Sequence, residues 1–148
     1  MIQSTITTSV AETEAFGAAV AAELASDPTL PRFIALYGAL GVGKTAFVRG
    51  LASVLCPGAA VRSPTFALVN EYRAKPCSVF HFDMYRIESE DELESIGFYD
   101  YLDRGLCVVE WSENIGYALP DRYFKIEITK CDTTAPDKRR ITANLIQQ

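Results

Sequence analysis

The feature that most constrains this chain is a glycine-rich segment at residues 38–45, GALGVGKT. It fits the phosphate-loop pattern G-x-x-x-x-G-K-[ST]. Residues 33–37 (FIALY) form an apolar run typical of a buried parallel strand, and residues 46–55 carry apolar side chains at helical spacing. A strand, a glycine loop and a helix in this order predict an α/β fold that binds a nucleoside triphosphate. A turn that matches the pattern by chance is the alternative, and the flanking strand and helix argue against it.

The residue types of the loop suit a phosphate ligand. Successive backbone N–H groups and the positive end of the following helix form an anion site, and glycines let phosphate oxygens come close. We expect the Lys44 ammonium group to contact the β- and γ-phosphates and the Thr45 hydroxyl to bind Mg²⁺, which keeps much of its shell as water and phosphate oxygen. The predicted nucleotide contacts from this segment are Gly38, Gly41, Val42, Gly43, Lys44, Thr45 and Ala46.

Two acidic residues are candidates to complete the site. Glu110 follows the apolar run 106–109, and Asp83 ends the segment 79–82. Ligands bind at the carboxyl ends of parallel strands in open α/β folds, so both side chains are expected beside the phosphates. One would hold Mg²⁺, directly or through water, while the other orients an attacking water or supports the ligand shell of the Mg²⁺. The alternative is that each is an ordinary strand-end carboxylate that caps a loop. The nearby phosphate loop favours a functional role for both, more firmly for Glu110.

Four other residues carry a functional and a structural interpretation. The Thr65 hydroxyl, in a loop that follows a proline, would reach the γ-phosphate or its Mg²⁺, and a simple turn before a strand is an equal alternative. His81 lies within a predicted strand and is interpreted as a packed structural histidine rather than a general base. Ser9 and Arg139 are candidates for contacts with the base or ribose, against ordinary surface roles. The guanine-reading pattern Asn-Lys-x-Asp is missing from the sequence, so ATP is the expected nucleotide.

The composition predicts one folded domain over residues 1–148. Hydrophobic residues make up 49% and charged residues 22%, as in ordinary folded proteins. No apolar run approaches the ~20 residues of a membrane span, and the N-terminus lacks a signal-peptide pattern. We therefore expect a cytoplasmic protein without a membrane partner. The net charge of −5 and the scattered basic residues argue against direct contact with nucleic acid.

The cysteine and histidine pattern excludes further site classes. The four cysteines are widely spaced without a Cys-x-x-Cys pair, and the chain has a single histidine. Zinc ligation and a disulfide framework are therefore not expected. Instead, we expect the cysteines to be reduced, buried thiols.

Further elements follow from alternation and capping patterns. Residues 2–8 alternate as a strand, and Ser9 with Glu12 forms a capping box that opens a helix to about residue 25. A hairpin is expected over residues 66–83, a second capping box opens a short helix at residue 89, and another hairpin spans residues 123–146. The sum is a three-layer, P-loop NTPase-like α/β fold with a mixed, mainly parallel sheet and antiparallel hairpins.

Several motifs together resemble those of the TsaE family, bacterial ATPases of tRNA threonylcarbamoyladenosine biosynthesis. The phosphate loop alone occurs in many families, and the order and spacing of the other motifs make the resemblance far more specific. The matching segments are 38–45, 63–66 (SPTF), 81–86 (HFDMYR), 92–94 (ELE) with Gly97 and Tyr101, and 109–111 (VEW).

The resemblance implies a compact P-loop ATPase that binds ATP and Mg²⁺ and hydrolyses ATP poorly alone. It implies the partner proteins TsaB and TsaD, which modify tRNA, so that this chain meets tRNA only indirectly. Carried over to this sequence, Lys44 binds phosphate, and Thr45 and Glu110 hold Mg²⁺. Thr65 and Asp83 fall in switch-like segments around the γ-phosphate.

Two other functions compete with a switch ATPase. A small-molecule or nucleoside kinase is one, although such enzymes usually carry an arginine-rich lid, and the arginines here are scattered. A scaffold that senses nucleotide without hydrolysing it is the other, and the intact set of charged candidates argues against a decayed site.

Overall fold

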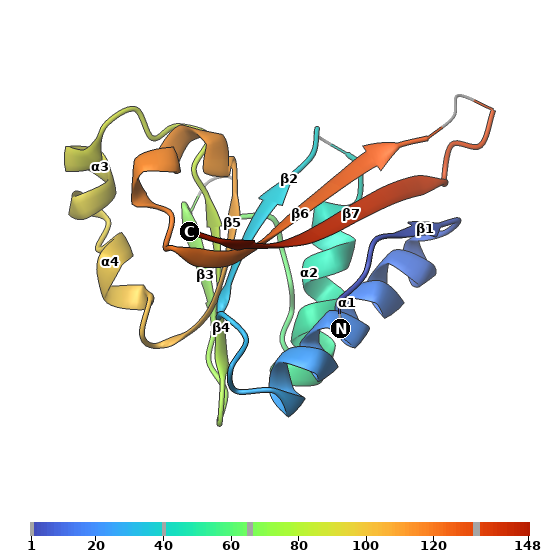
Figure 1. Cartoon of the computed structure of the whole chain (residues 1–148), viewed down its shortest axis with the longest axis horizontal. Coiled ribbons are helices and arrows are strands. Elements are labelled where there is room, and N and C mark those ends of the chain that lie inside the picture. Colours follow the sequence, from blue (N-terminus) through green and yellow to red (C-terminus); the bar gives the residue numbers. More distant parts are fainter. Residues whose placement is uncertain (1, 40, 65–66, 132–133) are drawn as a thin grey trace.

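The computed structural model describes residues 2–39, 41–64, 67–131 and 134–148. These residues form a seven-stranded sheet with the strand order β1-β7-β6-β2-β5-β4-β3 (Figure 1). The strands are β1 Thr5–Thr7, β2 Phe33–Tyr37, β3 Val69–Tyr72, β4 Ser78–Asp83, β5 Gly105–Glu110, β6 Arg122–Lys130 and β7 Arg139–Gln147.

The centre of the sheet is parallel and its two edges are antiparallel. Strands β6, β2, β5 and β4 run in one direction, while β7 and β1 at one edge and β3 at the other are antiparallel to their neighbours. Strands β2, β4 and β5 are almost wholly buried, as expected for parallel strands covered on both faces. The predicted mixed sheet with hairpins is confirmed. The parallel centre also brings the carboxyl ends of β2, β4 and β5 to one edge.

Helices cover both faces of the sheet and make three layers (Figure 1). Because side chains alternate along a strand, β2 sends Ile34 and Leu36 to one apolar cluster and Phe33 and Ala35 to the other. The first cluster includes side chains of α1 and α2, and the second includes side chains of α3, α4 and η1. The helices are α1 Val10–Ser26, α2 Lys44–Leu55, α3 Glu90–Ser95, α4 Phe98–Tyr101 and the 3₁₀ helix η1 Ser112–Ala118.

Helices α1 and α2 cross at very short range. The Ser9 hydroxyl accepts a hydrogen bond from the Glu12 N–H at 3.1 Å and so caps α1, as the capping box predicts. A Cβ at Gly50 of α2 would overlap the carbonyl oxygen of Glu14 in α1, and one at Gly17 would overlap the backbone of α2. Glycine at the crossing therefore lets the two backbones meet, which fixes the position of α2 and of the loop that leads into it.

Two predicted strands are shorter in the structure than in the sequence pattern. The strand expected over residues 2–8 is limited to Thr5–Thr7, because it is an edge strand that pairs only with β7. The hairpin expected over residues 66–83 is present, although Phe66 lies outside the described residues; the first strand begins at Val69, after Leu68, whose φ of 65° interrupts the extended backbone. Within the described ranges, no helix has the length and apolarity needed to cross a membrane.

Candidate functional site

The loop between β2 and α2 has the backbone of an anion cradle. Gly43, at the N-cap of α2, has a φ of 113°, a backbone conformation that residues with a Cβ rarely adopt. The Phe47 N–H bonds to the Gly43 carbonyl at 3.0 Å, while the N–H groups of the preceding first turn have no partner inside the helix. At the other end, a Cβ on Gly38 would lie 2.7 Å from the Ile128 carbonyl oxygen on β6. The loop is therefore held close to the sheet, and the first-turn N–H groups of α2 have no helical partner among the described residues, as an anion site requires.

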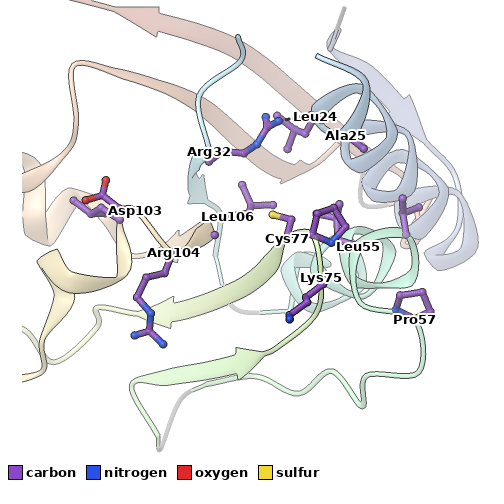
Figure 2. Close-up of a pocket in the computed structure, with 14 residues that line it drawn as sticks. Leu24, Ala25, Arg32, Leu55, Pro57, Lys75, Cys77, Asp103, Arg104 and Leu106 are labelled. Carbon is purple, nitrogen blue, oxygen red and sulfur yellow. Dashed lines mark hydrogen bonds between the residues drawn. The ribbon is translucent and has the colours of Figure 1, made fainter. Parts of the chain in front are cut away.

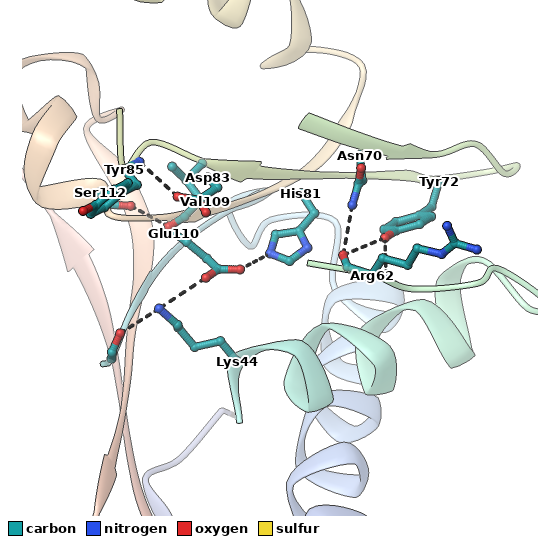
Figure 3. A network of polar contacts seen from close by, with 11 residues as sticks. Lys44, Arg62, Asn70, Tyr72, His81, Asp83, Tyr85, Val109, Glu110 and Ser112 are labelled. Atoms are coloured by element: carbon teal, nitrogen blue, oxygen red, sulfur yellow. Dashed lines mark hydrogen bonds and ion pairs between the residues drawn. The ribbon is translucent and has the colours of Figure 1, made fainter. Parts of the chain in front are cut away.

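Lys44 extends from the start of α2 across this loop toward β5 (Figure 3). Its Nζ donates to the Gly38 carbonyl at 2.7 Å and lies 3.2 Å from Oε1 of Glu110. The Trp111 ring centroid is 6.0 Å from the same Nζ. The lysine is buried, so its charge is balanced by a carboxylate and a carbonyl rather than by bulk water.

Strand register places the two candidate carboxylates side by side. Asp83 and Glu110 are direct partners in the parallel pair of β4 and β5, and each is the last residue of its strand. Oε2 of Glu110 lies 2.5 Å from Nε2 of His81. Asp83 accepts a hydrogen bond from the Tyr85 N–H at 3.0 Å. The predicted convergence of both acids on the edge beside the phosphate loop is therefore what the structure shows.

The surroundings shift the pKa values of the Asp83 and Glu110 carboxyl groups in opposite directions. Burial acts to raise the pKa of Glu110, but the hydrogen bond and charge of His81 and the charge of Lys44 outweigh it, and the net pKa is lowered. Burial raises the pKa of Asp83, and the negative charge of Glu110 adds to the rise. The protein thus holds one carboxylate ionised beside the lysine and makes the other a better proton acceptor.

The oxygen donors near Lys44 are of the kind that a magnesium ion binds. Among the described residues, no group of three or more His, Cys, Asp or Glu side chains converges on a point. Thr45, in the first turn of α2, and Glu110 are two of the described residues that could supply oxygen ligands here. Two protein oxygens with phosphate and water completing the shell is the coordination that Mg²⁺ favours.

The other predicted contacts lie around the loop in different roles. Val42 and Ala46 are buried, and Nε of Arg139 donates to the Val42 carbonyl at 2.7 Å. Arg139 thus ties the start of β7 to the phosphate loop, and its contact with a base or ribose stays a prediction. Ser9 is engaged in capping α1, and Thr65 lies outside the described residues.

The role of His81 is missed by sequence reasoning that treats it only as a packed residue. Its side chain is fully buried, yet it contacts the candidate Glu110. Strand alternation carries the signal, since His81 and Asp83 are two residues apart and face the same side of β4. That side is the one covered by α2, to which Lys44 belongs.

Two cavities lie at opposite edges of the sheet. A smaller one of about 270 Å³ adjoins the phosphate loop and is lined by Gly38, Trp111 and Glu127 among others. A larger one of about 710 Å³ lies at the amino ends of β4 and β5, between the ends of α1 and α2 (Figure 2). Leu106 and Arg32 are among its lining residues. Ligands of open α/β sheets bind at the carboxyl edge, so the smaller cavity belongs to the candidate site.

Comparison with known proteins identifies similar sequences and a similar structure. A family model described as "Threonylcarbamoyl adenosine biosynthesis protein TsaE" matches residues 7–141, a range that includes the loop, Asp83 and Glu110. The tRNA threonylcarbamoyladenosine biosynthesis protein TsaE of Rickettsia bellii is 35% identical over 136 residues, or 91% of this chain and 90% of the relative. The protein of the same name from Bacillus subtilis is 38% identical over 110 residues, or 74% and 66% of the two chains. A crystal structure of Bacillus subtilis YdiB matches with a TM-score of 0.74 at 29% identity, over 98% of this chain and 85% of that one.

Proposed function

The chain belongs to the TsaE family of threonylcarbamoyl adenosine biosynthesis proteins, and on that premise we propose that it is a Mg²⁺-dependent ATPase. The observation that carries this proposal is the position of Lys44, between the Gly38 carbonyl and Glu110 at the start of α2. A buried cation beside the N-terminus of a helix suits a polyphosphate. We further propose that hydrolysis resets a complex of TsaB and TsaD, so that the chain acts as a switch subunit in tRNA modification.

The residues of the site divide the work of hydrolysis among them. Lys44 would exchange the Gly38 carbonyl and the Glu110 carboxylate for phosphate oxygens. Thr45 and Glu110 would hold Mg²⁺, which when bound neutralises charge on the phosphates. Asp83, whose pKa burial raises, would accept a hydrogen bond or proton from the attacking water. Its neighbour Tyr85 keeps the carboxylate oriented through the backbone N–H at 3.0 Å.

The overall charge supports indirect contact with tRNA. The chain has a formal net charge of −5, which gives it little attraction for a phosphate backbone. We propose that TsaB and TsaD supply the tRNA-binding surface and act in the same compartment as this chain, the cytoplasm.

The first test is Mg²⁺-dependent ATP hydrolysis by the purified chain, alone and with TsaB and TsaD. Slow hydrolysis alone and strong stimulation by the partners is the expected result. Equal, negligible rates in both, despite tight ATP binding, would support a sensing scaffold instead. Faster phosphoryl transfer to a nucleoside or sugar than to water would support a kinase.

Lys44→Ala is the variant that tests the observation on which the proposal depends. A hydrogen bond to a charged group contributes about 1.5–3 kcal/mol, so ATP affinity should fall roughly ten- to a hundredfold. Equilibrium binding of ATP measures this loss. Arg49→Ala on the same helix is the matched control, because Arg49 is exposed and pairs with Glu14 at 2.8 Å, away from the loop. Unchanged ATP affinity in Lys44→Ala would contradict the assigned phosphate site.

A further inference from the structure

We propose that His81 is a positioning residue that holds one oxygen of Glu110 and leaves the other directed toward Lys44 and the magnesium site. The inference rests on the proposed function, because it concerns how the same site holds its metal. It assigns to His81 a role in ligand orientation rather than in packing alone.

Among the described residues, the His81 ring has Glu110 as its one polar partner. Its side chain is fully buried, and its Nε2 lies 2.5 Å from Oε2 of Glu110. A carboxylate oxygen only accepts, so Nε2 is the donor. The other ring nitrogen, Nδ1, has no hydrogen-bond partner within the part of the chain that the structure describes. Glu110 is therefore the contact that compensates for burying this polar ring.

The two oxygens of Glu110 have different partners, which separates their roles. Oε1 lies 3.2 Å from Nζ of Lys44, and Oε2 is held by His81. If Lys44 moves to phosphate, Oε1 loses its partner while Oε2 keeps its own. The carboxylate then stays in place with one oxygen available for Mg²⁺ or for a metal-bound water.

The backbone beneath this pair gives it a fixed frame. His81 and Glu110 come from the neighbouring parallel strands β4 and β5, whose residues pair in continuous register. Both strands are in the buried centre of the sheet, and Figure 3 shows the histidine ring beside the carboxylate. Partners that orient metal ligands typically change metal affinity 10- to 100-fold when they are replaced.

The test measures the Mg²⁺ requirement of ATP binding rather than hydrolysis. Trp111 is the single tryptophan of the chain and lies beside Lys44, so its fluorescence can follow nucleotide binding. In His81→Leu, the Mg²⁺ concentration that half-saturates binding at fixed ATP should rise about 10- to 100-fold. Affinity for ATP without Mg²⁺ should stay within about twofold, because Lys44 and the loop supply that contact.

Two substitutions separate orientation from packing. His81→Gln carries an amide N–H that can reach toward Glu110 and should restore most of the Mg²⁺ affinity, whereas His81→Asn is shorter and should not. Phe80→Leu is the matched control, because Phe80 is buried on the same strand but belongs to the cluster on the opposite face. If His81→Leu does not fold, the contrast between the Gln and Asn variants still decides the question.

The outcomes separate this inference from the proposed function. Wild-type Mg²⁺ dependence in His81→Leu or His81→Asn would overturn the role of His81 and leave the ATPase proposal standing. An equal loss in Phe80→Leu would also overturn it, because packing alone would then explain the effect. A wild-type chain that binds ATP without any Mg²⁺ dependence would overturn both.

Discussion

At the scale of single residues, the site joins charges that would be costly if they were buried alone. Lys44 and Glu110 are both less than a tenth exposed and lie 3.2 Å apart, so each compensates for burying the other. Asp83 differs, because its main hydrogen bond comes from a backbone N–H at 3.0 Å and its pKa is raised by burial. The site therefore contains one carboxylate that the fold stabilises as an anion and one that it does not.

Replacing Asp83 with asparagine should make the fold more stable and the ATPase slower. The asparagine carbonyl can still accept from Tyr85, while the buried negative charge is removed. Hydrolysis should fall by about 10²- to 10⁴-fold, the range of a lost general base. Urea unfolding and ATPase assays on the same preparation measure both effects.

The stability gained by Asp83→Asn should depend on pH. Because the pKa of Asp83 is raised in the folded chain, its ionised form opposes folding, and this penalty is complete above the folded pKa. The stability advantage of Asp83→Asn should therefore be largest near pH 7, shrink as the pH falls through the raised pKa of Asp83, and vanish below the ordinary Asp pKa of about 4. An advantage that grows as the pH falls would contradict the assignment.

At the scale of elements, the contact between α1 and α2 positions the phosphate loop. The two backbones approach so closely at Gly50 that a methyl group would overlap the Glu14 carbonyl oxygen. A backbone carbonyl cannot change rotamer to make room. The crossing therefore fixes how far α2 extends toward the edge where Lys44 meets Glu110.

Gly50→Ala should destabilise the protein although alanine favours an isolated helix. A Cβ at Gly50 would overlap the Glu14 carbonyl oxygen, so the cost should be in the upper part of the range of about 1–3 kcal/mol typical of overpacking and outweigh the ~1 kcal/mol gained from helix propensity. The melting temperature should fall by a few degrees, since about 1 kcal/mol shifts it by roughly 2–4 °C at this size. Gly116→Ala is the control, because a Cβ there meets no described atom within 4 Å. A higher melting temperature for Gly50→Ala than for Gly116→Ala would show that the helices separate easily.

At the scale of the whole molecule, the sheet separates two apolar layers, and side chains on its central strands are buried between the sheet and its helices. Cys107 lies in β5 between β2 and β4 and is fully buried. Burial raises the pKa of its thiol to about 12. Cys77 and Cys131 are only partly buried, so the reactivity of the different thiols measures how far the interior and the outer parts of the fold have opened.

Cys107 should resist alkylation until the whole fold opens. At pH 8 a thiol with this pKa is ionised in roughly one molecule in 10⁴, and only the thiolate reacts. Pulsed alkylation across a urea series, read by mass spectrometry, should label Cys107 with the same midpoint as the loss of helical circular dichroism. Cys77 and Cys131 serve as internal controls and should react at lower urea. Labelling of Cys107 at their rate in native buffer would show that the central sheet opens locally.

The sequence by itself determined the features that depend on neighbouring residues. The loop at 38–45, the Ser9 and Ser89 caps and the apolar central strands follow from patterns of a few residues, because backbone angles, first-turn N–H groups and strand alternation are local. The same logic placed Asp83 and Glu110 at the carboxyl ends of their strands, where the structure pairs them.

Only the tertiary structure decided which distant residues meet. The contact of His81 with Glu110 spans 29 residues, and that of Arg139 with the Val42 carbonyl spans 97. Both depend on the lateral order of the strands, which places β4 beside β5 and brings β7 near the loop after β2. Local patterns specify that a strand forms and which face is apolar. The choice of neighbouring strand is made by packing the whole sheet between its two layers of helices.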